Sequence, residues 1–189
     1  MTTNPRARRP KGRRPLRQGD LDGLCGVYCI VNAVRTLCPE VDRDTAEYLF
    51  ALLMQKLLST ASNPSMAVTW GIGRLALMSL VEEAINYVLD DFDIRLTMKR
   101  LPKGLRQNAG RDELWAYLEK AVSPECVAIL GLGGKYAHWS VAVQMTATSA
   151  KLVDSGEMRY LSRKRCTVRR TLKRCQIPPV HVLLIRRVP

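Results

Sequence analysis

The sequence predicts an α+β domain in which helices fill the first half of the chain and strands the second. Three observations carry this prediction. Apolar residues recur at helical spacing between residues 23 and 89. Short β-rich runs, separated by turn-forming residues, follow from residue 126 onward. Of the 189 residues, 47% are hydrophobic, which is enough for the core of one ordinary domain. Helices followed by consecutive strands are the order of α+β folds.

The individual elements follow from the same patterns. Asp22 is a predicted N-cap for the first helix. Asp112 is the predicted cap of a fourth, shorter helix in the middle of the chain. The predicted helices cover residues 23–37, 44–58, 72–89 and 112–122, with a loop at 62–65. The predicted strands cover residues 93–98, 126–130, 138–145, 151–153 and 180–185.

Positive charge gathers at the two ends of the chain. Of a net charge of +13, residues 1–17 contribute seven Arg or Lys and no acid, and residues 155–189 contribute ten with one acid. Residues 1–17 also hold three prolines, which predicts a disordered basic tail before a domain at 18–189. Such ends are either solvated surface or attract an acidic protein or nucleic acid.

Several classes of protein are disfavoured. No run approaches the roughly 18 apolar residues of a membrane span, so none is expected. The six cysteines include no Cys-x-x-Cys pair and the histidines number two, so neither zinc nor another cofactor is expected. The glycines of 131–134 precede a strand rather than a helix, which disfavours a nucleotide site and favours a flexible loop beside a substrate cleft. A reduced, cytoplasmic protein is expected, with a secreted effector left open.

Cys25 is the candidate nucleophile. It is expected near the start of the first helix, where free N–H groups and the helix dipole stabilise a thiolate. Gly26 would let a substrate backbone approach closely. The competing interpretation of Cys25 is a small buried residue, which describes most unbonded cysteines.

His138 is the candidate base and Asp154 the group that orients it. If residues 138–145 and 147–154 form a hairpin centred on Thr146, His138 and Asp154 become direct cross-strand neighbours on one face. Their Cβ atoms would then lie about 5 Å apart, within reach of an orienting hydrogen bond. The other histidine, His181, has no acid near it in the sequence and is expected to be structural.

These motifs resemble the papain-like cysteine peptidases. The segment Gln-Gly-Asp-Leu-Asp-Gly-Leu-Cys-Gly at 18–26, followed by an apolar helix, is similar to their nucleophile motif. The later His-Trp-Ser-Val-Ala-Val run at 138–143 and the Leu-Val-Asp-Ser run at 152–155 are similar to their histidine strand and aspartate. The likeness is greatest to the bacterial branch that trims leader peptides for bacteriocin exporters. In this family a glutamine before the cysteine helps form the oxyanion hole, a role that would fall to Gln18, although its spacing from Cys25 is one residue longer than usual.

The resemblance implies a cysteine hydrolase that cleaves a peptide or isopeptide bond in a protein or peptide substrate. Two alternatives stay open at this stage. The same Cys-His-Asp set would serve a transglutaminase or a glutamine deamidase. Alternatively, the fold persists without catalysis, and the basic ends bind nucleic acid or an acidic partner with steep salt dependence.

Overall fold

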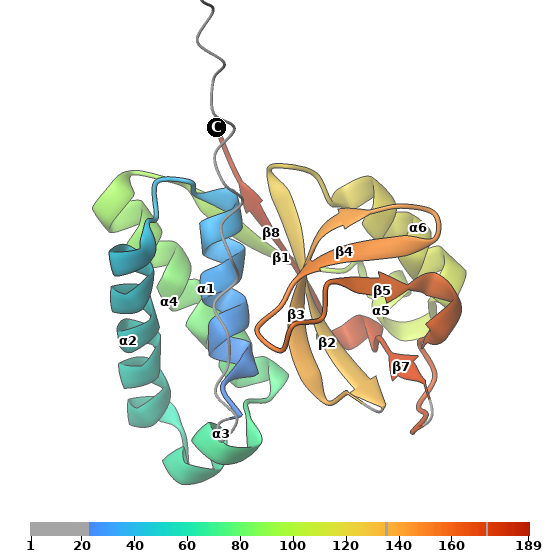
Figure 1. Cartoon of the computed structure of the whole chain (residues 1–189), viewed down its shortest axis with the longest axis horizontal. Helices are drawn as coiled ribbons and strands as arrows, with labels where there is room; N and C mark the ends of the chain where they lie inside the picture. Colours follow the sequence, from blue (N-terminus) through green and yellow to red (C-terminus); the bar gives the residue numbers. More distant parts are fainter. Residues whose placement is uncertain (1–22, 135, 173) are drawn as a thin grey trace, which may run out of the picture.

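The computed structural model describes residues 23–134, 136–172 and 174–189, and it confirms the α+β fold class. Helices α1 to α4 lie on one side of an antiparallel sheet, and α5 and α6 lie on the other side (Figure 1). The helix that bears Cys25 therefore packs on the sheet.

The long helices form where the sequence predicts them, with altered ends. Helix α1 begins at Cys25 rather than residue 23, and the predicted cap Asp22 lies outside the described residues. A short helix replaces the loop predicted after α2, because the Asn63 side chain accepts a hydrogen bond from the Met66 N–H at 3.1 Å and caps it. The prediction that Asp112 caps a helix is wrong, since Gly110 holds the cap position. The helices are α1 (Cys25–Leu37), α2 (Arg43–Thr60), α3 (Pro64–Trp70), α4 (Arg74–Phe92), α5 (Lys103–Asn108) and α6 (Arg111–Ala121).

The sheet follows the order β1-β8-β2-β3-β4-β5, with antiparallel neighbours throughout this path. A parallel pair, β6 and β7, joins the end of β2. A one-turn 3-10 helix, η2 (Pro179–His181), precedes the last strand. The strands are β1 (Leu96–Arg100), β2 (Cys126–Gly134), β3 (His138–Met145), β4 (Ser149–Val153), β5 (Tyr160–Ser162), β6 (Cys166–Thr167), β7 (Cys175–Gln176) and β8 (Val182–Arg187).

The hairpin of β3 and β4 forms, but the predicted register is wrong by two residues. Val141 pairs with Val153 rather than with Lys151, and the register shifts again between Ala142 and Gln144, where a β-bulge interrupts the ladder. Before the bulge, the shift of two keeps each side chain on its predicted face, whereas a shift of one would have reversed the face. Asp154 therefore remains close to the start of β3, diagonally rather than directly across the hairpin.

Two apolar cores cover the two faces of the sheet. The larger core contains the buried face of α1 with residues of α2, α4, β2, β3 and β8. The smaller core packs α6 against the opposite face. Helix α1 is almost entirely buried, with Val27, Ile30 and Val31 fully inaccessible. Burying this apolar stripe holds the N-terminal end of α1 in a fixed position against the sheet.

Among the described residues no single helix is long and apolar enough to cross a membrane, although α3 and α4, bent by 93° at their junction, pass such a test together.

Candidate active site

Cys25 is the first residue of α1, and a backbone contact fixes its approach. The Gly23 N–H donates to the Val68 carbonyl at 2.7 Å, which ties the chain before α1 to α3. No side chain fits there, because a Cβ on Gly23 would meet the backbone of Thr69 at 2.7 Å. Cys25 itself is 7% exposed, so the thiol borders the surface without projecting from it.

The expected role of Gly26 is wrong. A Cβ at this position would lie 2.7 Å from the Ile72 side chain and 3.2 Å from Leu77. The glycine therefore lets α1 pack closely against the start of α4, and its missing side chain makes room for the protein's own core rather than for a substrate.

The first residue of β3, His138, is positioned by its neighbours. Ala137 before it has a positive φ of 46°, a strained conformation for a residue with a side chain. The Trp139 indole N–H after it donates to the Ile72 carbonyl at 3.0 Å and so holds the strand against the segment that joins α3 to α4. The His138 side chain is 15% exposed.

Asp154 follows β4 and is buried at 3% exposure. Its Oδ2 accepts a hydrogen bond from His138 Nε2 at 2.9 Å, since a carboxylate can only accept. Its Oδ1 accepts from the Gly156 N–H at 2.8 Å and the Met158 N–H at 3.2 Å. Both carboxylate oxygens are therefore engaged, and the carboxylate cannot rotate without breaking these bonds.

The imidazole joins the carboxylate to the thiol. Cys25 and His138 line the same cavity and their side chains interact electrostatically, while His138 is hydrogen-bonded to Asp154. Because Nε2 is engaged by Asp154, Nδ1 is the nitrogen left to face the thiol. The structure thus brings three of the four candidate residues together, from α1, β3 and the end of β4. The fourth, Gln18, lies outside the described residues.

Burial and the two partners set the charge of His138. Burial alone would lower the pKa of His138, but the hydrogen bonds to Asp154 and Cys25 and their negative charges raise it from 6.5 to about 9. Burial alone would raise the pKa of Asp154, yet the hydrogen bond from His138 keeps it below the usual 3.8. At neutral pH the imidazole is therefore protonated and the carboxylate ionised.

A second cysteine lies one helical turn below Cys25. Cys29 is 2% exposed, and burial, together with the nearby Cys25 and Asp154, raises its pKa well above the ordinary thiol value. A thiol of this kind is a poor nucleophile. Cys29 is thus the natural internal comparison for Cys25.

A cavity of about 330 Å³ opens beside Cys25 and His138. One wall is the segment from Trp70 to Arg74, and another is the glycine-rich end of β2. The prediction that these glycines form a flexible loop is wrong, because residues 131–134 belong to β2. Their place at a cleft is as expected, since Gly131 and Gly133 line the cavity.

His181 also lines this cavity, which the sequence did not suggest. It ends η2 rather than lying inside a strand, and its ring centroid is 5.8 Å from that of Trp139. Burial and the charge of Arg74 lower the pKa of His181. Sequence reasoning also missed Arg74 and Trp70, because no local pattern shows that segments so far apart in the chain meet at one cavity.

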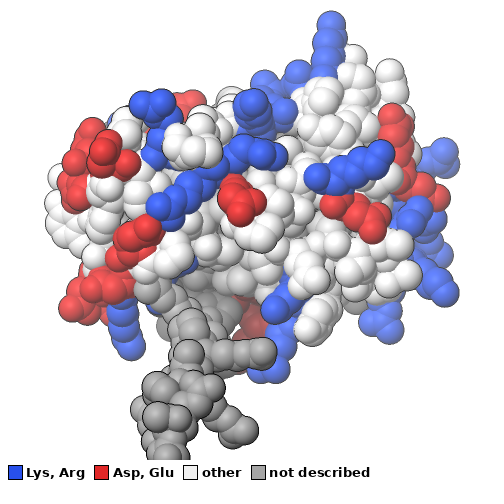
Figure 2. Space-filling view, turned by 90° about the horizontal axis from the view of Figure 1, so that it is seen from above, with Lys and Arg blue, Asp and Glu red and all other residues white. Residues whose placement is uncertain are grey.

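One face of the protein carries mixed charge. On the face in Figure 2, Lys and Arg side chains are interspersed with Asp and Glu. Opposite charges at the surface also form ion pairs, as Arg43 does with Glu47 at 2.8 Å and Arg187 with Glu40 at 2.9 Å. Exposed pairs of this kind contribute little to stability.

Comparisons with known proteins find similarity in solved structures alone. No family model matches the chain, and no curated protein matches it. One similar structure is a double glycine motif protease from an AMS/PCAT transporter in complex with the leader peptide, with a TM-score of 0.49, 10% identity, and 93% of each chain covered. Another is the peptidase domain of Streptococcus ComA, a bifunctional ABC transporter of a quorum-sensing pathway, with a TM-score of 0.47 and 12% identity, covering 92% of this chain and 96% of that one.

Both similar structures are peptidase domains of ABC transporters, the branch that the motifs around Cys25 and His138 resemble.

Proposed function

We propose that this chain is a papain-like cysteine hydrolase that cleaves a peptide or isopeptide bond. The observation that carries the proposal is that Cys25 and His138 lie beside one cavity and that Asp154 is hydrogen-bonded to the imidazole. A nucleophile, a base in contact with it and a group that orients the base are the parts that thiol hydrolysis needs.

In the proposed mechanism, the proton of Cys25 resides on His138 as an imidazolium, and the thiolate attacks the carbonyl carbon of the substrate. The first N–H groups of α1 have no partner within the helix and would stabilise the oxyanion, together with Gln18. His138 then protonates the leaving amine, and the acyl group remains on Cys25 as a thioester. Water, deprotonated by His138, hydrolyses the thioester and restores the thiol. Asp154 holds the imidazole with Nδ1 toward the sulfur throughout.

The pKa of His138 supports this assignment. An imidazole that stays protonated to about pH 9 beside a thiol favours the thiolate–imidazolium pair. Cys29, buried one turn below, lacks this partner and serves as the comparison within the same helix.

The first test is the pH dependence of Cys25 alkylation by iodoacetamide, with the labelled cysteine identified by mass spectrometry. We expect Cys25 to react near neutral pH much faster than Cys29, and His138→Ala to slow it by at least about tenfold. If Cys25 reacts like an ordinary thiol whether or not His138 is present, the proposal is wrong. Ammonia released from a substrate whose chain stays intact would instead identify a deamidase.

A further inference from the structure

The cavity beside Cys25 contains a guanidinium with a buried N–H group that has no hydrogen-bond partner among the described residues. Arg74, the first residue of α4, lines this cavity. Its Nη1 is buried and has no hydrogen-bond partner, and no described carboxylate forms an ion pair with it. A guanidinium keeps its charge at any relevant pH and carries five N–H donors. A buried donor left unsatisfied costs about 1–3 kcal/mol, and more when it is charged, so such a group in a cavity calls for an explanation, of which a bound ligand is one.

The surroundings of Arg74 are positive as well. Burial lowers the pKa of His181, which lines the same cavity, and the charge of Arg74 lowers it further. Burial and the charge of Arg106 lower the pKa of Arg100, and the charge of Arg74 adds a smaller effect in the same direction. Helix α5, which carries Arg106, packs against η2, which carries His181. Arg74 is thus the arginine that lines the cavity among the described residues, and the charges of Arg100 and Arg106 lie close enough to act on this region.

We propose that this cavity binds a carboxylate of the substrate through Arg74, so that the bond attacked by Cys25 lies within a few atoms of an acidic group. Arginine binds a carboxylate through two parallel N–H donors, which would satisfy the orphaned Nη1 and neutralise the charge of Arg74. The carboxylate comes either from an Asp or Glu side chain or from the end of a peptide chain. This inference rests on the proposed hydrolase, and the cavity volume of about 330 Å³ admits either source.

The test compares reagents that differ in charge alone. Cys25 is alkylated with iodoacetate and iodoacetamide, and with 3-bromopropionate and its amide, so that the carboxylate is presented at two distances from the sulfur. The readout is the ratio of the carboxylate rate to the amide rate at Cys25 in the parent, Arg74→Gln and Arg74→Lys. His138 is present in the parent and in both Arg74 variants, so its attraction for anions cancels when their rate ratios are compared.

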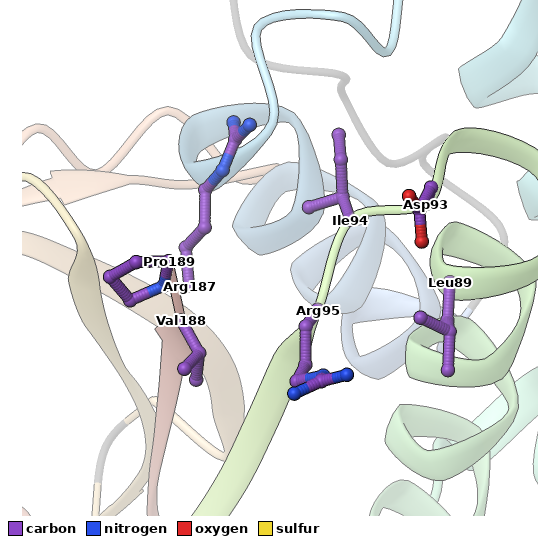
Figure 3. A pocket seen from close by; sticks show the side chains of 7 residues that line it. All are labelled: Leu89, Asp93, Ile94, Arg95, Arg187, Val188 and Pro189. Atoms are coloured by element: carbon purple, nitrogen blue, oxygen red, sulfur yellow. The ribbon is translucent and has the colours of Figure 1, made fainter.

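Arg95→Gln is the matched control. Arg95 is exposed and lies at the opposite end of α4, beside Leu89 and Val188, at a separate cavity (Figure 3). The 19 residues of α4 place its two ends roughly 28 Å apart. Loss of a positive charge at this distance changes the net charge of the protein as Arg74→Gln does, without touching the candidate site.

We expect Arg74→Gln to lower the rate ratio by about tenfold, as losing a charge-assisted hydrogen bond implies. Arg74→Lys should fall between that variant and the parent, and Arg95→Gln should match the parent. A ratio that is the same in Arg74→Gln and Arg95→Gln overturns the inference. If Arg74→Gln lowers the rate ratio but His138→Ala leaves the rate of Cys25 alkylation unchanged, the carboxylate site stands and the proposed hydrolase is refuted. The two failures can therefore be told apart.

The source of the carboxylate is read from protection of Cys25 by short peptides, which requires no cleavage. One peptide carries a glutamate and an amidated end, a second is neutral with a free C-terminal carboxylate, and a third is neutral and amidated. Protection by the first alone indicates an acidic side chain, and protection by the second alone indicates a chain end. Equal protection by all three, unchanged in Arg74→Gln, overturns the inference.

Discussion

Replacing Asp154 by asparagine should change the protonation of His138 more than it changes the fold. The Gly156 and Met158 N–H groups both donate to Oδ1 of Asp154. An asparagine would keep its carbonyl oxygen at these donors and turn its NH2 group toward His138 Nε2. An NH2 group donates and cannot accept, so it would favour the imidazole with its proton on the wrong nitrogen, or force the contact apart.

The size of the effect follows from the pKa of His138. The rise from 6.5 to about 9 is worth about 3 kcal/mol, shared between Asp154 and Cys25. A carboxylate in direct contact accounts for about 1–3 pKa units of such a shift. We therefore expect the pKa of His138 to fall by at least about one unit in Asp154→Asn. The rate of Cys25 alkylation at neutral pH should fall with it.

The measurement is an NMR titration of the imidazole rings. The chain has two histidines, so His181→Gln assigns both signals at once. In the parent, His138 should titrate near pH 9, and His181 below 6.5. Asp112→Asn is the control, since that carboxylate is exposed and pairs with Arg163 at 3.1 Å. If both histidines titrate near 6.5, or if Asp154→Asn leaves the upper titration in place, the assigned hydrogen-bond series is wrong.

Three further predictions concern stability and packing. The pKa of His138 is about 9 in the folded protein and 6.5 when unperturbed. Its contribution to stability is therefore complete below about pH 6.5 and is lost as the pH rises through 9. Urea unfolding at pH 6.5 and 9.5 should show this loss in the parent and should not show it in His138→Ala. Gly131→Ala places a Cβ 2.8 Å from the Trp139 ring and should lower the free energy of unfolding by about 1–3 kcal/mol. Gly104→Ala, in an open helical position, should raise it by up to about 1 kcal/mol. Equal effects of the two substitutions would contradict the packing around Gly131. Gly71→Ala, at a φ of 87°, should cost about 1–3 kcal/mol and slow thiol alkylation; an unchanged rate would show that this residue does not position the thiol.

The sequence contains enough to predict the elements that carry the candidate site. Helix α1 and strand β3 have clear periods of 3.6 and 2, and β3 has the predicted bounds. The register of the β3–β4 hairpin was missed because its turn has no Gly or Asn and because the bulge after Ala142 has no sequence pattern. The candidate His138–Asp154 pair is in contact despite this, since the error was an even number of residues.

Other features have no local pattern from which to predict them. Strands β6 and β7 have two residues each, too few for any periodicity. Arg74 and His181 meet at the cavity because α4 and η2 pack near the same end of β2, and they are more than a hundred residues apart in the chain. A contact between such distant segments depends on tertiary packing rather than on local propensity.

One short segment holds both halves of the candidate site. The Val68 carbonyl accepts from Gly23, two residues before the thiol, and the Ile72 carbonyl accepts from the Trp139 indole, one residue after the imidazole. The residues between these two carbonyls are therefore the bridge that sets the position of α1 relative to β3. Gly71 lies within this bridge in a conformation that favours glycine. The distance between thiol and imidazole thus depends on a segment that carries neither group, and the same segment, continuing to Arg74, forms one wall of the cavity. A substrate that binds against this wall would contact the residues that fix the position of the nucleophile relative to its base.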